Sequence, residues 1–442
     1  MLDIAFVRQH PRRVKEAAQQ KNVDVNIDRL LRLDAQRRAL QGDMDRQAQK
    51  RHENAQAIAA LPQRAEHRRR AEMKKRGRAI KEKLAILEKK LRTVQRSYHA
   101  LLAAVPNIPT ADTPTGADAS GNTILRQSGD KPHFAFTPKE HWQLGKNLQL
   151  IDNERAAKVS GSRFTYLKGD IALLEFALVQ YALSVLTSRE ALERIRAKAT
   201  LDVPTTPFIP VIPPALMKPE ALHKMARLEP REERYYLERD DLYLIGSAEH
   251  SMGAMHMDEI LPEQQLPLRY VGFSSAFRRE AGSYGKDVHG ILRMHQFDKV
   301  EMESFTLPEI ALREQDFFVA IQETLMQSLR MPYQVVLVCT GDMGAPDARQ
   351  VDIETWFPGQ RRYRETHSAD FMTDYQARRL NTKVRRTSGA TEFAHMNDAT
   401  VFAIGRTIAA LIENTQREDG SVGIPSVLRP YLGNRETLAA VG

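Results

Sequence analysis

One short segment of this 442-residue chain, residues 277–301, brings arginines, glutamates and a phenylalanine together in the order FRREAGSYGKDVHGILRMHQFDKVE. The planar guanidinium group of an arginine such as Arg278 can hold two anionic oxygens at once. A carboxylate such as Glu301 can accept hydrogen bonds from a polar ligand. Taken singly, however, an arginine or glutamate more often forms a surface ion pair, and Phe297 alone would more often be a core residue. These residue types permit anion binding without identifying the anion.

Counts and spacing argue against other kinds of catalytic centre. Cys339 is the only cysteine, so an intrachain disulfide and a thiolate-rich zinc site are impossible, and its apolar surroundings predict a core position. His250 and His256 are six residues apart, as are His289 and His295, and this spacing suits no helical metal pair. The chain has no Gly-x-Gly-x-x-Gly or Walker-type loop, so a nucleotide site must be built in another way.

Residues 277–301 resemble motif 2 of the class II aminoacyl-tRNA synthetases in its seryl form, where Arg-x-Glu-Ala-Gly-Ser is followed by a loop and by His-Gln-Phe-x-Lys-Val-Glu. Pro213 and Pro214 fall where motif 1 places its proline at the dimer interface, and residues 427–431, VLRPY, resemble motif 3. The other segments similar to seryl-tRNA synthetases are residues 150–152, 157–164, 340–343, 352–360 and 374–379. Because the matches follow one another in order along nearly the whole chain, the resemblance is specific.

The resemblance implies that the chain activates L-serine with ATP and then transfers it to the 3′-terminal ribose of serine tRNA. Activation joins two anions, a carboxylate and the α-phosphate, so positive groups must bring them together. Arg278 and Arg429 are the implied catalytic residues: Arg278 would bridge the α-phosphate and the serine carboxylate, while Arg293 and Arg429 would hold the outer phosphate oxygens. Phe297 would stack on adenine. The implied nucleotide-binding residues are Arg278, Arg279, Glu280, Arg293, Phe297, Glu365, Thr366, His367, Ser368 and Arg429.

Magnesium is the implied cofactor, since it binds carboxylates together with substrate phosphates. The expected protein ligands are Glu365 and Ser368, and no zinc site is expected. No residue needs to form a covalent intermediate, because positioning and charge stabilisation suffice.

The resemblance also implies how serine is held. Glu301 is expected to hydrogen-bond the substrate hydroxyl, since a pocket built for a hydroxyl rejects analogues that lack it. The loop formed by Ser247, Ala248 and Glu249 would contact the amino group. The implied serine-binding residues are Ser247, Ala248, Glu249, Arg278, Glu301 and Thr400.

Several positions in this region depart from the family pattern. Ser247 replaces threonine and Thr400 replaces serine, and both keep a hydroxyl group. Asp398 stands where asparagine is common and adds a negative charge. Residues 365–371, ETHSADF, replace a stretch rich in serine and cysteine, so Asp370 is also unusual. The departures bear on how strictly serine is selected.

The elements that position these residues are strand-like and helix-like runs that do not alternate strictly. This order favours an α+β fold with an antiparallel sheet over a doubly wound parallel sheet. The resemblance implies a class II catalytic domain whose central antiparallel sheet is flanked by helices. The strand-like runs are residues 242–245, 268–273 and 333–339, and the helix-like runs are residues 171–188, 312–329 and 404–414. We therefore divide the chain into an arm at 1–104, a linker or irregular segment at 105–132, and a catalytic domain at 133–442.

The arm is predicted to be an antiparallel helical hairpin. Its second half carries apolar residues spaced four and three apart, which is the seam of a coiled coil, and Pro62 would end the first helix. The strong seam is Ile80, Leu84, Leu87, Leu91, Val94, Tyr98 and Leu101, and the weaker one is Leu30, Leu33, Leu40, Met44, Ile58 and Leu61. Each helix would span about 33 residues, or roughly 50 Å.

The positive charge of the chain is concentrated on this arm. Residues 64–92 hold 13 Lys or Arg and 4 Asp or Glu, a surplus of nine that equals the net charge of +9. A one-signed surface indicates a polyanionic partner, and phosphate contacts of this kind position a nucleic acid. The resemblance implies that this partner is tRNA(Ser), and that selenocysteine tRNA is also charged with serine.

The resemblance also implies a homodimer. The chain has no charge-free apolar run of about 18 residues and no signal-peptide pattern at its start, so we expect no membrane segment and a cytoplasmic location. Two alternatives stay open: a paralogue that adenylates an amino acid for a carrier protein, and a non-catalytic RNA-binding homologue. The basic arm argues against the first alternative, and Arg278, Glu301 and Arg429 argue against the second.

Overall fold

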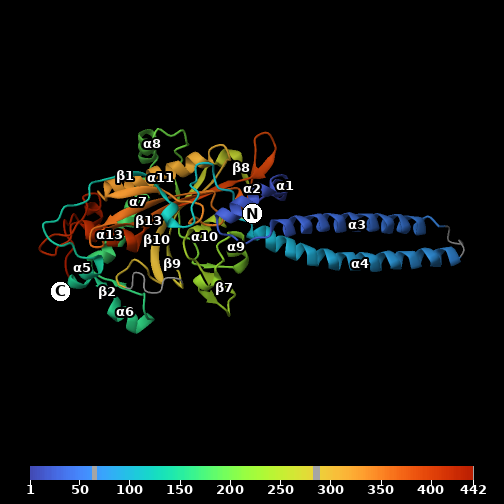
Figure 1. Cartoon of the computed structure of the whole chain (residues 1–442), viewed down its shortest axis with the longest axis horizontal. Helices are drawn as coiled ribbons and strands as arrows, with labels where there is room; N and C mark the ends of the chain where they lie inside the picture. Colours follow the sequence, from blue (N-terminus) through green and yellow to red (C-terminus); the bar gives the residue numbers. More distant parts are fainter. Residues whose placement is uncertain (62–66, 282–288, 442) are drawn as a thin grey trace. The chain divides into compact units, whose positions relative to one another are not determined.

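The computed structural model describes residues 1–61, 67–281 and 289–441 (Figure 1). The chain divides into two compact units, Met1–Ile108 and Pro109–Gly442.

Helices are the only regular elements among the described residues of the first unit. It contains α1 (Ile4–Gln9), α2 (Pro11–Gln20), α3 (Ile27–Ala59) and α4 (His67–Ala104). Helices α3 and α4 run antiparallel as a hairpin, which confirms the predicted arm (Figure 1). Most of the seam predicted for α4 is confirmed, because Ile80, Leu84, Leu87, Leu91 and Tyr98 are buried. Val94 and Leu101 are only partly buried, and Leu102 is buried next to Leu101.

The weaker seam of α3 is supplemented by polar contacts. Of its predicted members only Leu30 is fully buried, and Asp34 and Asn54 are buried as well. Asp34 pairs with Arg37 at 3.1 Å and with Arg38 at 3.0 Å, while Asn54 Nδ2 donates to the carbonyl of Met73 in α4 at 3.0 Å. These contacts give the Asp34 carboxylate and the Asn54 amide nitrogen a partner, as burial of polar groups normally requires. The predicted turn at 61–63 lies mostly outside the described residues, since only Leu61 is described.

The second unit is built on an eight-stranded sheet in the order β1-β11-β12-β13-β16-β10-β9-β4. All neighbouring strands are antiparallel except β4 and β9, so the predicted antiparallel sheet is confirmed. The strands are β1 (Thr123–Ser128), β4 (Ile209–Val211), β9 (Leu268–Phe277), β10 (Gln296–Thr306), β11 (Tyr333–Leu337), β12 (Arg349–Phe357), β13 (Arg362–Thr373) and β16 (His395–Ala403).

Three helices pack on this sheet and match the predicted helix-like runs. They are α7 (Asp170–Leu186), α11 (Ala311–Ser328) and α13 (Ile404–Asn414). Their apolar side chains form the main core with the inward side chains of the sheet, and Cys339 is buried as predicted. The other helices are α5 (His141–Asn147), α6 (Asn153–Ser160), α8 (Arg189–Lys198), α9 (Pro219–Lys224), α10 (Glu249–Gly253) and α12 (Tyr375–Leu380), with 3-10 turns η1 (Ala119–Gly121), η2 (Arg231–Glu233), η3 (Glu263–Gln265) and η4 (Arg429–Leu432).

Three small sheets complete the described part of this unit. They are β2 (Ile151–Asp152) with β3 (Tyr166–Leu167); β5 (Leu216–Met217), β7 (Leu242–Leu244) and β6 (Tyr236–Leu237); and β8 (Ile260–Pro262), β14 (Lys383–Arg385) and β15 (Thr391–Phe393).

Residues 105–132 contain a regular strand that the sequence pattern did not indicate. Strand β1 lies within this segment and pairs with β11 at one edge of the large sheet. Five of its six side chains are exposed, so the alternation that marks a half-buried strand is absent. Among the described residues, no single helix is long and apolar enough to cross a membrane; α7 and α8 meet that test only together, bent by 78°.

Candidate active site

A cavity of about 170 Å³ lies where β10, β13 and β16 meet the start of α13. Nine of the residues singled out in the sequence line it, so residues more than 150 positions apart in the chain come together. These nine are Glu249, Arg278, Glu280, Arg293, Phe297, Glu365, Thr366, Ser368 and Thr400. The cavity is also lined by Arg227, Ile291, Leu292, Met294, Lys299, Asp370, Ala403, Gly405 and Arg406.

Two irregularities in the sheet shape this cavity. The pairing of β12 with β13 shifts at Thr366, so Glu365 and Ser368 both face the cavity although they are three residues apart. The pairing of β10 with β16 shifts at Val401, with the same result for Thr400 and Ala403. Bulges of this kind re-aim side chains and are common beside active sites.

The bulge in β13 also decides where His367 lies. Because it is next to Ser368 on the strand, its side chain points to the opposite face and packs edge-on against Phe402, with ring centroids 6.0 Å apart. Its Nδ1 lies 2.8 Å from Thr366 Oγ1. Burial lowers the pKa of His367 to about 3, so the imidazole is neutral. His367 does not line the cavity.

Besides Arg227, three arginines line the cavity, and each is oriented by a hydrogen bond or an ion pair. Arg278 follows β9 directly; its Nε donates to the carbonyl of Gly246 at 3.0 Å, and its guanidinium carbon lies 5.4 Å from the centroid of the Phe297 ring. Arg293 Nη1 is 3.2 Å from Glu280 Oε2. The third, Arg406, lies in the first turn of α13.

Arg406 is paired with the acid that faces the same cavity. Its Nη1 is 3.2 Å from Glu365 Oε1 and donates to the Glu365 carbonyl at 3.1 Å. Desolvation alone would raise the pKa of Glu365, but Arg406 and Arg278 outweigh it and hold that pKa below its ordinary value. Glu365 is therefore ionised between two guanidinium groups.

The structure does not bring Arg429 or Arg279 to this cavity. Arg429 begins η4, where its Nε donates to the Ile424 carbonyl at 3.0 Å and its Nη1 pairs with Glu436 at 2.8 Å. Arg279 is exposed, with its guanidinium carbon 4.7 Å from the centroid of the Tyr235 ring. Arg406, which the sequence analysis did not single out, takes the place in the cavity that was expected for Arg429. The only sequence feature that could have pointed to Arg406 is its position just after the segment that carries Thr400.

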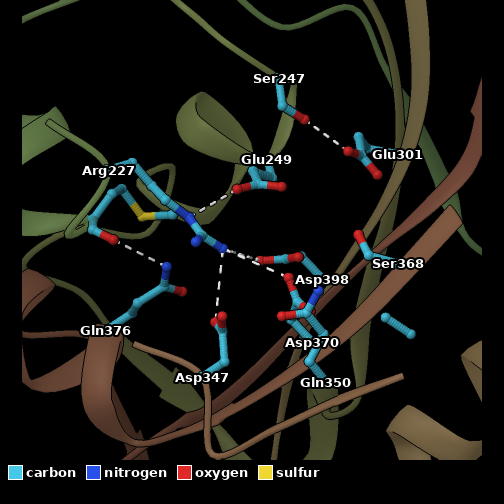
Figure 2. A network of polar contacts seen from close by, with 12 residues as sticks. Arg227, Ser247, Glu249, Glu301, Asp347, Gln350, Ser368, Asp370, Gln376 and Asp398 are labelled. Atoms are coloured by element: carbon cyan, nitrogen blue, oxygen red, sulfur yellow. Dashed lines mark hydrogen bonds and ion pairs between the residues drawn. The ribbon is translucent and has the colours of Figure 1, made fainter. Parts of the chain in front are cut away.

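Of the predicted serine-binding residues, Glu249, Arg278 and Thr400 line the cavity, whereas Ser247, Ala248 and Glu301 do not. Ser247 Oγ donates to Glu301 Oε1 at 2.7 Å (Figure 2). Lys299 Nζ is 3.3 Å from Ser247 Oγ and also contacts the Glu301 carboxylate. Ser247, Ala248 and Glu301 are fully buried behind the lining residues, and Glu301 faces Thr400 across the β10–β16 pairing.

A partly buried arginine outside every motif recognised in the sequence lies among the acids beside the cavity (Figure 2). Arg227, in the segment after α9, places its Nε 2.8 Å from Glu249 Oε1. Its Nη2 lies 3.2 Å from Asp398, 3.8 Å from Asp370 and 3.9 Å from Asp347. Although desolvation opposes it, Arg227 together with neighbouring cations lowers the pKa of Glu249 to about 2. No periodicity or motif marks Arg227, so only the tertiary structure reveals it.

The cavity residues fit magnesium better than a metal held by protein alone. Among the described residues, no group of three or more His, Cys, Asp or Glu side chains is arranged to hold a metal ion. Magnesium does not need such a group, because it commonly uses one or two carboxylates and substrate phosphates. Glu365 and Ser368 both line the cavity and offer suitable oxygen ligands.

Comparison with known proteins agrees with this geometry. Residues 1–109 match the model of the seryl-tRNA synthetase N-terminal domain, and residues 234–415 match that of the tRNA synthetase class II core domain (G, H, P, S and T). The chain is 39% identical to the serine–tRNA ligase of Symbiobacterium thermophilum over 434 residues, covering 98% of each chain. It is also 39% identical to that of Thermodesulfovibrio yellowstonii over 440 residues, covering 98% of this chain and 99% of the other.

Two solved structures are similar over the whole length. The seryl-tRNA synthetase of Pyrococcus horikoshii complexed with ATP has a TM-score of 0.87 at 35% identity and covers all of both chains. The cytoplasmic serine–tRNA ligase of Naegleria fowleri in complex with AMP has a TM-score of 0.83 at 28% identity, covering 100% of this chain and 99% of the other. With this full-length similarity and the cavity described above, the chain belongs to the seryl-tRNA synthetase family of class II aminoacyl-tRNA synthetases.

Proposed function

We propose that this protein activates L-serine with ATP and ligates it to the 3′ end of tRNA(Ser). The observation that carries the proposal is the cavity that has Arg278, Arg293 and Arg406 around Phe297, with Glu249 and Thr400 also in its lining. Such a cavity can hold a triphosphate and a small zwitterion side by side. The ATP and AMP complexes of the two similar structures support the nucleotide part.

In the first step, a serine carboxylate oxygen attacks the α-phosphorus of ATP, the bond to the β-phosphate oxygen breaks, and pyrophosphate leaves with its electron pair. Arg278 would hold both the carboxylate and the α-phosphate, and Arg293 and Arg406 would hold the outer phosphates. Because charge moves onto the leaving pyrophosphate, fixed cations stabilise the transition state more than the ground state. Phe297 would stack on adenine, with Glu280 and Thr366 completing the nucleotide site.

Serine would bind beside these arginines. Its ammonium group would lie against Glu249, and its hydroxyl group would reach Glu301 and Thr400. The Ser247 hydroxyl and Lys299 hold the Glu301 carboxylate in place. A hydroxyl pocket of this kind disfavours alanine and glycine, since they would leave buried polar groups unpaired.

Glu365 and Ser368 would hold Mg²⁺ together with the ATP phosphates. The ion supplies positive charge that neutralises the phosphate oxygens. In the second step a ribose hydroxyl of the terminal adenosine attacks the adenylate carbonyl, and AMP leaves. We also propose that selenocysteine tRNA is a substrate and that the enzyme acts in the cytoplasm.

The basic helix α4 would contact the tRNA backbone. Its exposed lysines and arginines make a one-signed surface, which suits phosphate contacts that position a nucleic acid. Residues 64–66 of the basic stretch lie outside the described residues.

A homodimer is supported by exposed apolar side chains in the second unit. Ile212, next to the edge strand β4, is 92% exposed, and Ile209, Leu173 and Phe176 are also exposed. Apolar side chains of this size at an open sheet edge are typical of a surface that a partner covers.

Serine-dependent exchange of labelled pyrophosphate into ATP tests the activation step, with threonine, alanine and glycine as competitors. We expect serine to be preferred. Arg278→Ala should reduce exchange about 100-fold or more, as removal of one charge-stabilising donor does. Arg194→Ala, an exposed arginine on α8, serves as the matched control.

Charging of serine tRNA then separates the proposed enzyme from its two rivals. Exchange without tRNA charging would indicate an adenylating paralogue, and tRNA binding without exchange would indicate a non-catalytic RNA-binding protein. Either outcome contradicts the proposal.

A further inference from the structure

A second row of acidic side chains crosses the sheet just beyond the expected serine contacts. Asp370 on β13 and Glu303 on β10 are both direct cross-strand partners of Asp398 on β16. Asp370 and Glu303 lie two residues after Ser368 and Glu301, and Asp398 lies two residues before Thr400 on the antiparallel strand between them. Strands alternate with a period of two, so this row shares the face of the serine contacts and lies roughly 7 Å deeper.

Burying this row as carboxylates is costly unless a neighbouring cation or a bound proton offsets the charge. Asp370, Asp398 and Glu303 are all more than nine-tenths buried. Among the described residues, Asp370 Oδ1 and both carboxyl oxygens of Glu303 have no hydrogen-bond partner, and Asp370 lines the cavity. Like charges directly opposite each other on neighbouring strands destabilise a sheet.

Arg227 supplies a cation at this place. Its guanidinium group reaches Asp398 at 3.2 Å and Asp370 at 3.8 Å, while its Nε faces Glu249 at 2.8 Å (Figure 2).

The backbone that carries this side chain is held on both sides. Gln376 Nε2 donates to the Met225 carbonyl at 3.0 Å, and Arg234 Nε donates to the Arg227 carbonyl at 2.9 Å. The guanidinium is thus fixed at the deep end of the amino-acid pocket, in contact with the lining acids.

We propose that Arg227 is a specificity-determining residue, whose guanidinium closes the deep end of the amino-acid pocket by filling an acidic chamber formed by Asp370, Asp398, Glu303 and Glu249. This inference rests on the proposed serine activation. The filled chamber limits the substrate side chain to about the size of a hydroxymethyl group. It also repels substrates with a second ammonium group, because their charge would meet that of Arg227. Without Arg227, the same carboxyl groups would attract a short diamino acid.

Arg227 also acts on serine itself, through Glu249. The carboxylate that would hold the serine ammonium group forms an ion pair with the Arg227 guanidinium group at 2.8 Å. Loss of Arg227 should therefore weaken serine binding more than it slows the chemical step.

Pyrophosphate exchange measured with serine, 2,4-diaminobutyrate and norvaline tests the inference. Norvaline has the shape of 2,4-diaminobutyrate but lacks its second charge. We expect the unaltered protein to prefer serine over 2,4-diaminobutyrate by about 100-fold or more in kcat/KM. In Arg227→Ala, kcat/KM for serine should fall about tenfold, mainly through KM, and that for 2,4-diaminobutyrate should rise about tenfold.

Added guanidinium ion should restore part of the serine activity of Arg227→Ala, while Arg227→Lys should keep the rejection of 2,4-diaminobutyrate. Arg231→Ala is the matched control, since Arg231 belongs to the same segment and is exposed. Arg227→Gln replaces Arg227→Ala if the latter does not fold.

The inference is overturned if Arg227→Ala activates serine within about twofold of the unaltered protein. It is also overturned if Arg227→Ala raises kcat/KM for norvaline as much as for 2,4-diaminobutyrate, because the additional space alone would then explain the increase. Failure of the unaltered protein to exchange with serine would instead contradict the proposed function. The effect of Arg227→Ala on 2,4-diaminobutyrate relative to norvaline could still be measured in that case.

Discussion

At the scale of single residues, the cavity is made of charges that are held in place before substrate arrives. Arg278 is oriented by the Gly246 carbonyl, Arg293 by Glu280, and Arg406 by Glu365. Charges that need no reorganisation stabilise a transition state more effectively than mobile ones.

Arg406 and Arg429 give a direct comparison. We expect Arg406→Ala to lower kcat/KM for ATP in pyrophosphate exchange about 100-fold, the loss typical of one fixed cation at a reacting phosphate. Arg429→Ala should cost clearly less, since its guanidinium pairs with Glu436 and lies outside the cavity lining. Steady-state kinetics of both variants would check this. If Arg429→Ala lowered kcat/KM for ATP as much as Arg406→Ala or more, Arg429 rather than Arg406 would bind the outer phosphates.

Asp398 should make the protein less stable as pH rises. Desolvation, reinforced by Glu249 and opposed by Arg227, raises the pKa of Asp398 from 3.8 to about 8. The folded state therefore binds the Asp398 proton more tightly than the unfolded state between about pH 4 and 8, and the free energy of unfolding falls across that range.

Thermal and denaturant unfolding at pH 5 and pH 8 would measure this effect. Each unit of pKa corresponds to about 1.4 kcal/mol. The free energy of unfolding of the unaltered protein should therefore fall by on the order of 2 kcal/mol or more between pH 5 and pH 8 because of Asp398, and Asp398→Asn should abolish that fall. Asp202→Asn is the control, because Asp202 is exposed. The same pH slope in both variants would refute the assignment.

At the scale of elements, two bulges orient side chains toward the cavity, and the basic helix α4 provides the proposed tRNA contacts. The bulges at Thr366 and Val401 lie on neighbouring strands and turn Glu365 and Ala403 toward the cavity. A regular ladder would have put both of these side chains on the other face, because successive side chains alternate.

Helix α4 should govern tRNA charging more than amino-acid activation. Replacing its exposed Lys74, Lys75, Arg76 and Arg78 by glutamine should raise KM for tRNA about tenfold or more and reduce the salt dependence of binding, since each lost phosphate contact removes a released counterion. Serine-dependent exchange needs no tRNA and should change far less.

Charging and exchange assays at several salt concentrations would test this role of α4. Neutralising four exposed basic residues of the second unit, Arg189, Arg194, Lys198 and Arg417, provides the control. If that control raises KM for tRNA as much, general charge rather than α4 is responsible.

At the scale of the whole molecule, the chain separates into a basic helical unit, for which we propose nucleic-acid binding, and a unit that carries the cavity. The charge surplus of residues 64–92 equals the net charge of the entire chain, so the rest of the protein is neutral overall. We assign the proposed dimer interface to the second unit, where Ile209, Ile212, Leu173 and Phe176 are exposed.

The native protein should sediment as a dimer, and Ile212→Asp combined with Phe176→Asp should shift it toward monomer. Burying two charges in an apolar interface costs several kcal/mol, which is a large part of a typical dimer affinity. Analytical ultracentrifugation would report the change. Val159→Asp is the control, because Val159 on α6 is also an exposed apolar residue. This variant should not alter the sedimentation of the native protein. A native monomer would contradict the proposed dimer.

Much of the fold could be predicted because its signals are local. The heptad spacing of α4 marks one face of a helix, and the apolar runs of α7, α11 and α13 mark helices that pack on a sheet. Strand β1 could not be predicted in this way, since an exposed edge strand needs no alternating pattern.

By itself, the sequence determined the family, the two-part organisation and most of the residue types of the site, because ordered motifs and charge runs are properties of the linear chain. Only the tertiary structure decided which of these side chains share the cavity. The bulge in β13 determines which face of the sheet the side chains of Glu365 and His367 lie on. Long-range packing places Arg406 and Arg227 in the cavity lining, although the sequence analysis recognised no motif around either residue. Side-chain direction depends on strand register and on neighbours distant in the chain, and neither is written in local spacing.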